Sequence, residues 1–262
     1  MKYADLHVHT TASDGTDGLL RRVRDAKAKG LSCIAITDHD TFHPELEQPV
    51  TEIRGLEVIS GAELEVIVDG MKVELLAYFI DRNDREIAEY VEDTYSARIE
   101  RMKEMVDRVN EVIDSEVTFE EVEDMAGTTV ARPHLAKTLV AKEEAESVSD
   151  AFEKYISRDS YAYVPVEKTG SGNIIDMVHR SGGVLSLAHP GRNIPAERFE
   201  DVLSILQEQG LDAIEAKYYY ERFKNSSKKM YFGNELSMEM AKKYGFLVTG
   251  GSDCHGSTSG FF

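Results

Sequence analysis

The stretch LSCIAITDHDT, residues 31–41, joins a nearly continuous apolar run to a group of polar residues. An apolar run of this length without polar alternation is typical of a strand that is covered on both faces. His39 lies directly after the run, at the end of the strand where parallel α/β folds gather their functional side chains. The pattern of a short buried strand followed by polar residues recurs along the chain.

Strand patterns alternate with helical patterns for most of the sequence. The predicted strands cover residues 3–9, 31–37, 56–68, 72–79, 184–188, 212–216 and 246–250. Apolar residues have helical spacing at 19–26, 173–181, 196–209 and 227–244. Asp69-Gly70 lies between two predicted strands and signals a hairpin. The alternation predicts an α/β fold, a mainly parallel sheet or barrel with helices outside.

Residues 84–160 interrupt this alternation. The segment is rich in charge, and its apolar residues form a stripe at helical spacing. No strong strand pattern follows until YAYVPV at 161–166. We therefore expect an inserted helical subdomain at 84–160 within a barrel domain of residues 1–83 and 161–262. Longer outer helices are the alternative explanation for the same pattern.

The composition limits the classes of protein. The chain has 262 residues and a formal charge of −18, from 30 Lys and Arg against 48 Asp and Glu. Hydrophobic residues make up 42%, enough for a sizeable core, and no run approaches the ~18 apolar residues of a membrane span. Such acidity argues against broad, non-specific nucleic-acid binding. There is no signal-peptide stretch at the start, and Cys33 and Cys254 form no disulfide framework, so we expect a cytoplasmic protein.

Side chains that bind metals gather at the predicted strand ends. His7 and His9 are two residues apart on the first strand, so their side chains share one face. Parallel strands bring their carboxyl ends to one mouth, and imidazole with carboxylate suits Zn, Mn or Fe. Cys254 alternates out of phase with its neighbours and is expected to point away. The sequence thus predicts a metal site at five strand ends, formed by His7, His9, His39, Glu63, His189, Asp253 and His255.

These residues also lie in motifs that resemble those of a known family. DLHVHTTASDG, ITDHDT, GAE, RPHLA, LAHPGR and GSDCHG, which run from residue 5 to residue 256, are similar in order and spacing to the motifs of the PHP (polymerase and histidinol phosphatase) superfamily. The resemblance is closest to its stand-alone metal-dependent phosphoesterases with a helical insert. It implies a distorted (β/α)7 PHP barrel whose site holds two or three divalent metal ions, commonly Mn, Zn or Fe.

The resemblance also implies a set of metal ligands. Carried over position by position, the set is His7, His9, Asp14, His39, Glu63, His189, Asp253 and His255. Asp14 taken alone also fits a loop turn or a helix cap. One position departs from the family, because VELLAYF at 73–79 has Glu74 where relatives usually have a histidine. Either Glu74 binds metal as a harder ligand and favours Mn or Fe, or it swings out and leaves one metal weakly held.

Further residues are candidates for contacts with substrate. In relatives the RPHLA motif contacts substrate phosphate, which implies this role for Arg132 and His134, and His134 is the best candidate to protonate a leaving group. Arg192 and Lys217 are further candidate phosphate contacts. The neighbouring tyrosines 218–220 either stack a base or pack the rim of the mouth.

We therefore expect an enzyme that hydrolyses a phosphate mono- or diester with a metal-activated water. Its expected substrate is a small phosphorylated molecule, a nucleotide of the 3′,5′-bisphosphate type or a short single-stranded nucleic acid, with no membrane and no obligate protein partner. The first alternative is a histidinol-phosphate-like phosphatase. A non-catalytic metal-binding PHP module and C–N bond hydrolysis on a related metal barrel are the others.

Overall fold

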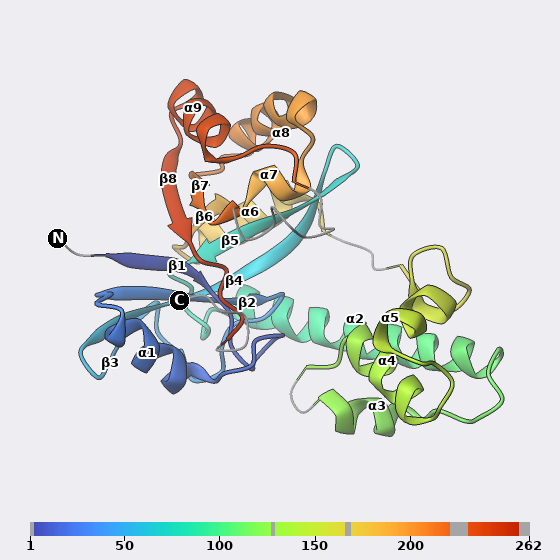
Figure 1. Ribbon diagram of the computed structural model, residues 1–262. Helices are drawn as coiled ribbons and strands as arrows, with labels where there is room; N and C mark the ends of the chain where they lie inside the picture. The colour runs from blue at the N-terminus through green and yellow to red at the C-terminus, as the bar shows by residue number, and fades with distance from the viewer. Residues whose placement is uncertain (1–2, 127–128, 166–168, 221–229, 257–262) are drawn as a thin grey trace. The chain divides into compact units, whose positions relative to one another are not determined.

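The computed structural model describes residues 3–126, 129–165, 169–220 and 230–256 (Figure 1). The chain divides into two compact units, one of residues 1–91 with 168–262 and one of residues 92–167. The division falls inside helix α2 (Arg85–Asn110), which begins in the first unit. An inserted domain with the bounds 84–160 stays a prediction about domain organisation.

The first unit is built on one sheet that curves into a nearly closed barrel (Figure 1). In the described residues its strands are β1 (Ala4–Val8), β2 (Cys33–His39), β3 (Val50–Ile53), β4 (Leu56–Val68), β5 (Met71–Tyr78), β6 (Val184–Leu187), β7 (Ala213–Tyr218) and β8 (Leu247–Gly251). Their spatial order is β1-β2-β4-β5-β6-β7-β8, with β3 paired to β4 beside this path. β5 runs antiparallel to both of its neighbours, and the remaining pairs on the path are parallel. The predicted α/β barrel is confirmed.

Backbone hydrogen bonds bring the two ends of this strand order together. The His9 amide donates to the carbonyl oxygen of Cys254 at 3.0 Å, and the Asp253 amide donates to that of His7 at 2.9 Å. Val8 and Cys254 form a parallel bridge between the same segments. The first strand therefore lies beside the residues that follow β8.

The predicted hairpin joins β4 and β5. Asp69 and Gly70 both have positive φ angles, 45° and 73°. Positive φ at both central residues is what a two-residue type I′ turn requires, and its twist matches that of the two strands. The Asp-Gly signal in the sequence therefore identified this turn correctly.

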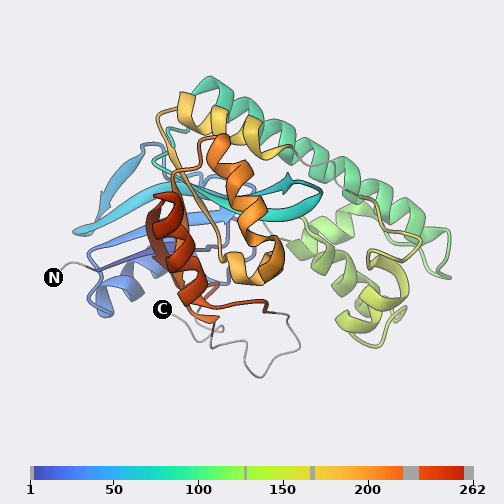
Figure 2. The same cartoon turned by 90° about the horizontal axis from the view of Figure 1, so that it is seen from above.

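Helices pack on the outside of the barrel. In the first unit these are α1 (Leu19–Ala28), α6 (Ser171–Arg180), the short α7 (Pro190–Asn193), α8 (Ala196–Glu208) and α9 (Asn234–Tyr244). Figure 2 shows α8 in orange and α9 in red against the strands. Val178 of α6 and Leu203 of α8 join Leu64 and Leu75 of the sheet in one buried cluster. Strands covered in this way are apolar on both faces, which explains the nearly continuous apolar runs in the sequence.

The second unit is helical and has an apolar core of its own. It contains the remainder of α2, followed by α3 (Phe119–Ala126), α4 (Arg132–Ala141), α5 (Val148–Ala151) and a π-helical turn, η1 (Phe152–Ile156). Its buried core includes Met105, Val109, Leu135, Leu139 and Ile156. Apolar residues at helical spacing therefore predicted the secondary structure of this segment correctly.

Residues 161–165, where a strand is predicted to begin, form a turn and irregular backbone instead. Arg108 donates to the carbonyl oxygen of Tyr163 at 3.1 Å, and Arg101 Nε donates to that of Val164 at 2.7 Å. These guanidinium groups occupy the acceptors that a neighbouring strand would use. The strand prediction is wrong here because the apolar alternation reflects burial of side chains such as Val164 rather than strand pairing.

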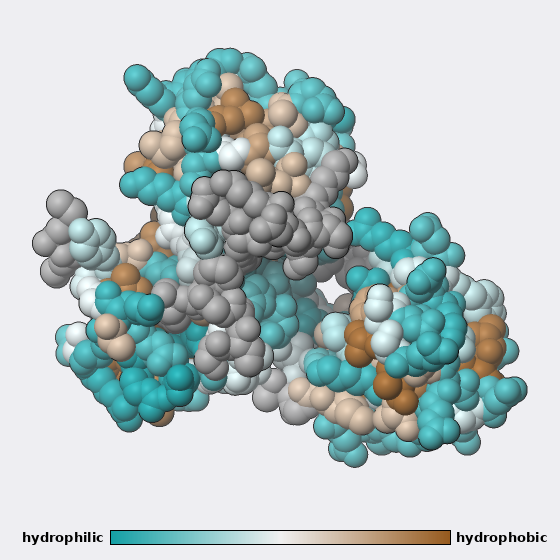
Figure 3. All heavy atoms as spheres, viewed as in Figure 1, coloured by the Kyte–Doolittle hydropathy of each residue, from teal (hydrophilic) through white to brown (hydrophobic). Residues whose placement is uncertain are grey.

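Figure 3 shows hydrophilic residues over most of the visible face of each unit. This surface accommodates much of the formal charge of −18. Among the described residues, every helix is too short or too polar to span a membrane.

Close strand packing at Gly61 depends on the missing side chain. Gly61 lies within β4, opposite Tyr78 of β5. A Cβ at Gly61 would collide with the carbonyl oxygen of Ala77 and would lie 3.2 Å from that of Ile36. Glu63 follows two residues later on the same face of the strand. The approach of β2 and β5 to this glycine therefore sets the position of Glu63.

We predict that Gly61→Ala destabilises the fold. The added methyl group must separate β5 from β4, and overpacking of this kind costs about 1–3 kcal/mol. Gly170→Ala is the matched control, because no neighbouring atom lies within 4 Å of a Cβ added there. Urea denaturation should give a lower free energy of unfolding for Gly61→Ala and a change within about 0.5 kcal/mol for Gly170→Ala. Equal unfolding free energies for the two variants would contradict this account.

Candidate metal centre

The mouth of the barrel is lined by buried ionisable side chains. His7 lies on β1 and His9 directly follows it, Glu63 comes from β4, His189 follows β6, and Asp253 follows β8. All five side chains are buried. Buried charged groups are stable only when they are paired or when they bind an ion. The arrangement therefore needs a source of compensation within the cluster.

Among the described residues, three groups of side chains each bring possible metal-binding atoms within 4.8 Å of one another. The first group is formed by His7, His9 and Glu63. Glu63 Oε2 lies 3.3 Å from His7 Nε2 and 3.4 Å from His9 Nε2. The two Nε2 atoms are 3.1 Å apart. Asp253 Oδ1 is 3.2 Å from His9 Nε2 and adds a carboxylate at the same point.

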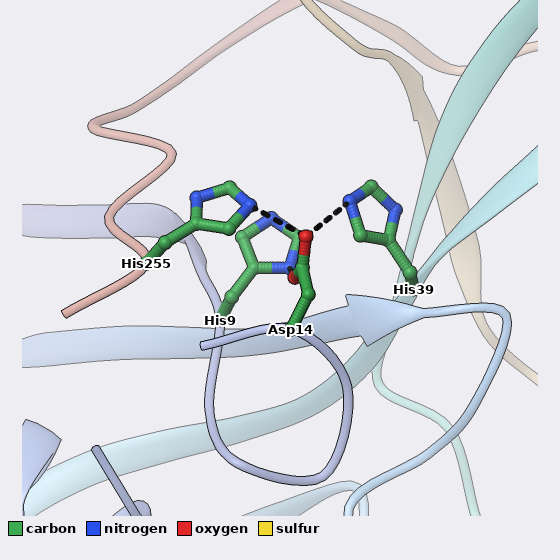
Figure 4. Close-up of side chains that lie close together, drawn as sticks. All are labelled: His9, Asp14, His39 and His255. Carbon is green, nitrogen blue, oxygen red and sulfur yellow. Dashed lines mark ion pairs between the residues drawn. The ribbon is translucent and has the colours of Figure 1, made fainter. Parts of the chain in front are cut away.

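The second group is formed by His9, Asp14, His39 and His255. Figure 4 shows the three imidazole rings arranged around the carboxylate of Asp14. Its Oδ2 lies 3.3 Å from Nε2 of His255 and 3.8 Å from Nε2 of His39. The sequence left Asp14 open between a ligand and a loop or cap residue, and the structure places its carboxylate among the three histidines.

The loop that carries Asp14 is held by Asp38, the residue before His39. Asp38 accepts hydrogen bonds from the Thr10 amide at 2.7 Å and from the Ser13 hydroxyl at 2.6 Å. A carboxylate that accepts several hydrogen bonds from one loop can fix the conformation of that loop without itself binding a metal ion. In the sequence Thr37-Asp38-His39, His39 thus belongs to the cluster, and Asp38 holds the loop that carries Asp14.

The third group is formed by His39, Glu63 and Glu74. His39 Nδ1 lies 3.1 Å from Glu63 Oε2. His189 lies beside this group, with its Nε2 2.8 Å from Glu63 Oε1 and 3.6 Å from Glu74 Oε2. The side-chain amide of Asn193 donates to Glu74 Oε2 at 2.8 Å and holds the carboxylate toward the cluster. Glu74 is therefore directed into the group in this structure.

The atoms present fit divalent cations. Glu63 Oε2 and His9 Nδ1 are buried, and neither has a hydrogen-bond partner among the described residues. The donor set consists of imidazole nitrogens and carboxylate oxygens, which suits Zn, Mn or Fe. An ion among these ligands would satisfy atoms that hydrogen bonds within the chain leave unsatisfied.

The electrostatics of the cluster also favour positive charge. Burial raises the pKa of Glu63, but the imidazoles of His7 and His39 outweigh this effect and hold that pKa well below its usual range. Burial lowers the pKa of His7, but the carboxylates of Glu215 and Glu63 outweigh it and raise that pKa well above its usual range. The carboxylates thus create a negative field that stabilises either a proton or a metal ion.

Two of the side chains in the cluster come from strained backbone. His189 and Asp253 have φ angles of 24° and 53°, in the left-handed region that residues with a side chain rarely adopt. The His189 amide donates to Glu215 Oε2 at 2.8 Å, and the Asp253 amide donates to the carbonyl oxygen of His7 at 2.9 Å. These bonds hold a conformation that costs on the order of 1–3 kcal/mol per residue.

Like Asp38 and Asn193, two further residues support the cluster in roles that the sequence did not predict. Glu215 of β7 is fully buried, and its Oε1 lies 3.1 Å from Nδ1 of His7. The Tyr218 hydroxyl donates to Asp253 Oδ2 at 2.7 Å. The signal for Glu215 was an acidic residue within an apolar strand, at the fourth position of DAIEA. No ligand motif contains Glu215, so the sequence did not predict a role for it in the site.

The candidate phosphate contacts of the barrel differ in their positions. Arg192 Nη1 lies 3.1 Å from the Tyr218 hydroxyl and 3.3 Å from Asp253 Oδ2, so it borders the cluster. Lys217 is exposed on β7. Cys254 is buried, and its sulfur accepts from Arg22 Nη1 at 3.0 Å, so it points away from the cluster as expected.

Arg132 and His134 belong to the second unit. The Arg132 guanidinium lies 5.5 Å from the ring centres of both Phe152 and Tyr163 and donates to the carbonyl oxygen of Ile156 at 3.3 Å. His134 Nδ1 accepts from the Ala131 amide at 3.1 Å at the start of α4. Their roles toward substrate stay predictions.

The fold and the sequence both match known proteins. A Bifidobacterium adolescentis protein named as a metal-dependent phosphoesterase has a crystal structure that superposes with a TM-score of 0.74, at 30% identity, over 97% of this chain and 88% of that one. The 5′-3′ exoribonuclease Rnm of Escherichia coli is 32% identical over 80% of this chain and 73% of its own length.

Two further relatives cover nearly the whole chain. A phosphoribosyl 1,2-cyclic phosphate 1,2-diphosphodiesterase of Eggerthella lenta is 26% identical over 96% of this chain and 94% of its own length. A 3′,5′-nucleoside bisphosphate phosphatase of Chromobacterium violaceum is 23% identical over 99% of this chain and 90% of its own length. The family model described as PHP domain matches residues 5–249. The chain therefore belongs to the PHP domain family.

Proposed function

We propose that this protein is a metal-dependent phosphoesterase that hydrolyses nucleotides or short single-stranded RNA. The observation that carries the proposal is the overlap of three ligand groups, each pair of which shares one residue, His9, His39 or Glu63. The buried Oε2 of Glu63 has no hydrogen-bond partner among the described residues. Metal-assisted hydrolysis of phosphate esters requires this kind of site. Membership of the PHP domain family supports the same reaction class.

Each ligand group is a candidate position for one divalent ion, so two or three Mn, Zn or Fe ions are proposed. Ions held there would bind phosphoryl oxygens, lower the pKa of a water molecule and stabilise charge on the leaving oxygen. The proposed ligands are His7, His9, Asp14, His39, Glu63, Glu74, His189, Asp253 and His255.

Residues at the border of the cluster are proposed to hold the substrate. The Arg192 guanidinium lies beside Asp253, and a planar guanidinium binds phosphate oxygens in a defined orientation. Lys217 supplies further positive charge on β7. Arg132 and His134 are proposed to contact phosphate through the RPHLA motif, with His134 as the proton donor to the leaving oxygen. Burial, with a smaller effect of Lys137, lowers the pKa of His134.

The substrate class rests on chemistry that the relatives share. An exoribonuclease, a phosphoribosyl cyclic phosphate diphosphodiesterase and a nucleoside bisphosphate phosphatase all act on phosphate esters of ribose. A body with a formal charge of −18 repels a long duplex, whereas a small substrate can enter one cationic mouth. The two free cysteines support a cytoplasmic location for such an enzyme.

The family's ligand pattern is matched at all positions but one, that of Glu74, which argues against a non-catalytic PHP module. A histidinol-phosphate-like phosphatase stays as the second candidate, because it needs the same centre. The two candidates differ in the leaving alcohol, so a substrate panel separates them.

The first prediction concerns activity. With Mn²⁺, the protein should release phosphate, nitrophenol or a nucleoside monophosphate, as the ester dictates, from at least one of adenosine 3′,5′-bisphosphate, a 5′-phosphorylated trinucleotide RNA, p-nitrophenyl phosphate and its bis-ester. EDTA should abolish the release, and excess Mn²⁺ should restore it. Histidinol phosphate serves as the comparison substrate. No turnover of any ester at full metal occupancy would refute the proposed function.

The second prediction concerns His9, which belongs to two of the three ligand groups. His9→Ala should remove roughly one ion per chain, measured by inductively coupled plasma mass spectrometry, and should lower activity by more than about 100-fold. His179→Ala is the matched control, because His179 lies on α6 and pairs with Asp212. Wild-type metal content in His9→Ala would place the centre elsewhere.

The third prediction concerns Glu74. Replacing its carboxylate by an imidazole in Glu74→His should shift the preference of the centre from Mn²⁺ toward Zn²⁺ by about tenfold, because imidazole is the softer ligand. Competition between the two ions reports this ratio. Glu57→His, at an exposed position of β4, is the control. An unchanged ratio and unchanged metal content would mean that Glu74 binds no metal.

A further inference from the structure

Glu215 is buried behind the metal centre and has no assigned role. It lies on β7 and is fully buried. It is absent from the three ligand groups found among the described residues. A buried carboxylate is costly unless its oxygens receive hydrogen bonds. The partners of Glu215 therefore explain its position.

Three segments of the barrel meet at this carboxylate. Its two oxygens lie 3.1 and 3.3 Å from Nδ1 of His7 on β1. Its Oε2 also accepts from the backbone amide of His189 at 2.8 Å. Gly251 of β8 allows His7 and the carboxylate to approach this strand, because a Cβ there would collide with His7 and would lie 3.0 Å from Glu215 Oε1. The side chain is thus enclosed by the elements that carry the ligands.

The hydrogen-bonding capacity of these partners fixes where the proton on His7 lies. An ionised carboxylate only accepts, so Nδ1 of His7 must carry the proton that it shares with Glu215. In a neutral imidazole the lone pair is then on Nε2. Nε2 is the atom that faces Glu63 Oε2 at 3.3 Å and His9 Nε2 at 3.1 Å. The lone pair is directed into the first ligand group.

We propose that Glu215 is a positioning residue that fixes the His7 tautomer and thereby sets the metal affinity of the centre. The inference rests on the metal centre that the proposed function requires. A carboxylate behind a ligating histidine orients the ring and makes it a stronger ligand, and loss of such a carboxylate lowers metal affinity by about 10–100-fold.

A glutamine at this position tests the idea because an amide has one accepting oxygen. Both partners of Glu215, His7 Nδ1 and the His189 amide, donate to it. If the amide oxygen accepts from His189, the amide nitrogen faces His7 and donates to Nδ1. The His7 proton must then move to Nε2, where it blocks the lone pair that would bind metal.

The experiment compares wild type, Glu215→Gln and Glu57→Gln, an exposed glutamate of β4. Mn²⁺ affinity is measured on the full chain by competition with a chelating dye, in the absence of substrate. We expect about 10–100-fold weaker binding in Glu215→Gln and wild-type binding in Glu57→Gln. In metal-free protein, at a pH high enough for the His7 ring to be neutral, ¹⁵N chemical shifts should place its proton on Nδ1 in wild type and on Nε2 in Glu215→Gln.

Mn²⁺ binding within twofold of wild type, or a His7 proton that stays on Nδ1 in Glu215→Gln, overturns the proposal. Should Glu215→Gln fail to fold, Glu215→Asp keeps both accepting oxygens. We expect Glu215→Asp to keep the proton on Nδ1, and its transfer to Nε2 would overturn the proposal. Since no ester enters these measurements, a wild-type protein that binds Mn²⁺ but hydrolyses nothing would refute the phosphoesterase and leave the role of Glu215 intact.

Discussion

One carboxylate oxygen, Oε2 of Glu63, lies within 3.4 Å of three imidazole nitrogens, those of His7, His9 and His39. Such a crowded arrangement forms only if three strands hold a strict register. His39 pairs with Glu63 between β2 and β4, and Gly61 allows β5 to approach from the other side. The geometry of the barrel mouth therefore depends on backbone packing that leaves room for nothing larger than hydrogen at one position.

Around this oxygen lies a layer of supporting residues that belong to none of the three ligand groups. Asp38 fixes the loop of Asp14, Asn193 orients Glu74, and Glu215 joins His7 to the backbone of His189. These contacts explain part of the acidic composition, because several carboxylates act as acceptors inside the fold and not as solvated surface. They also explain how strained backbone persists at the ligands.

The sequence could predict a feature when the residues that determine it are close together along the chain. His7 and His9 were identifiable because alternation along one strand is a local property, and the strand ends located the mouth. The role of Glu215 was not, since it depends on β1 closing against the segment after β8, the strand that pairs with β7. β3 was missed because a four-residue edge strand carries little pattern. The strand predicted at 161–166 is absent from 161–165, the part of it that the structure describes, where two arginines distant in sequence bind the carbonyl groups of Tyr163 and Val164.

The bridge between Val8 and Cys254 has a consequence for how the protein is made. His7 and His9 meet partners that follow the last strand of the barrel, so the centre cannot assemble until the ribosome has translated β8 and the residues after it. Contacts of such sequence separation are slow to form, because a long loop must close before they contribute stability. Until then, the early histidines are exposed to whatever metals the cell contains. Selection of the correct ion therefore falls to the finished barrel and not to the nascent chain.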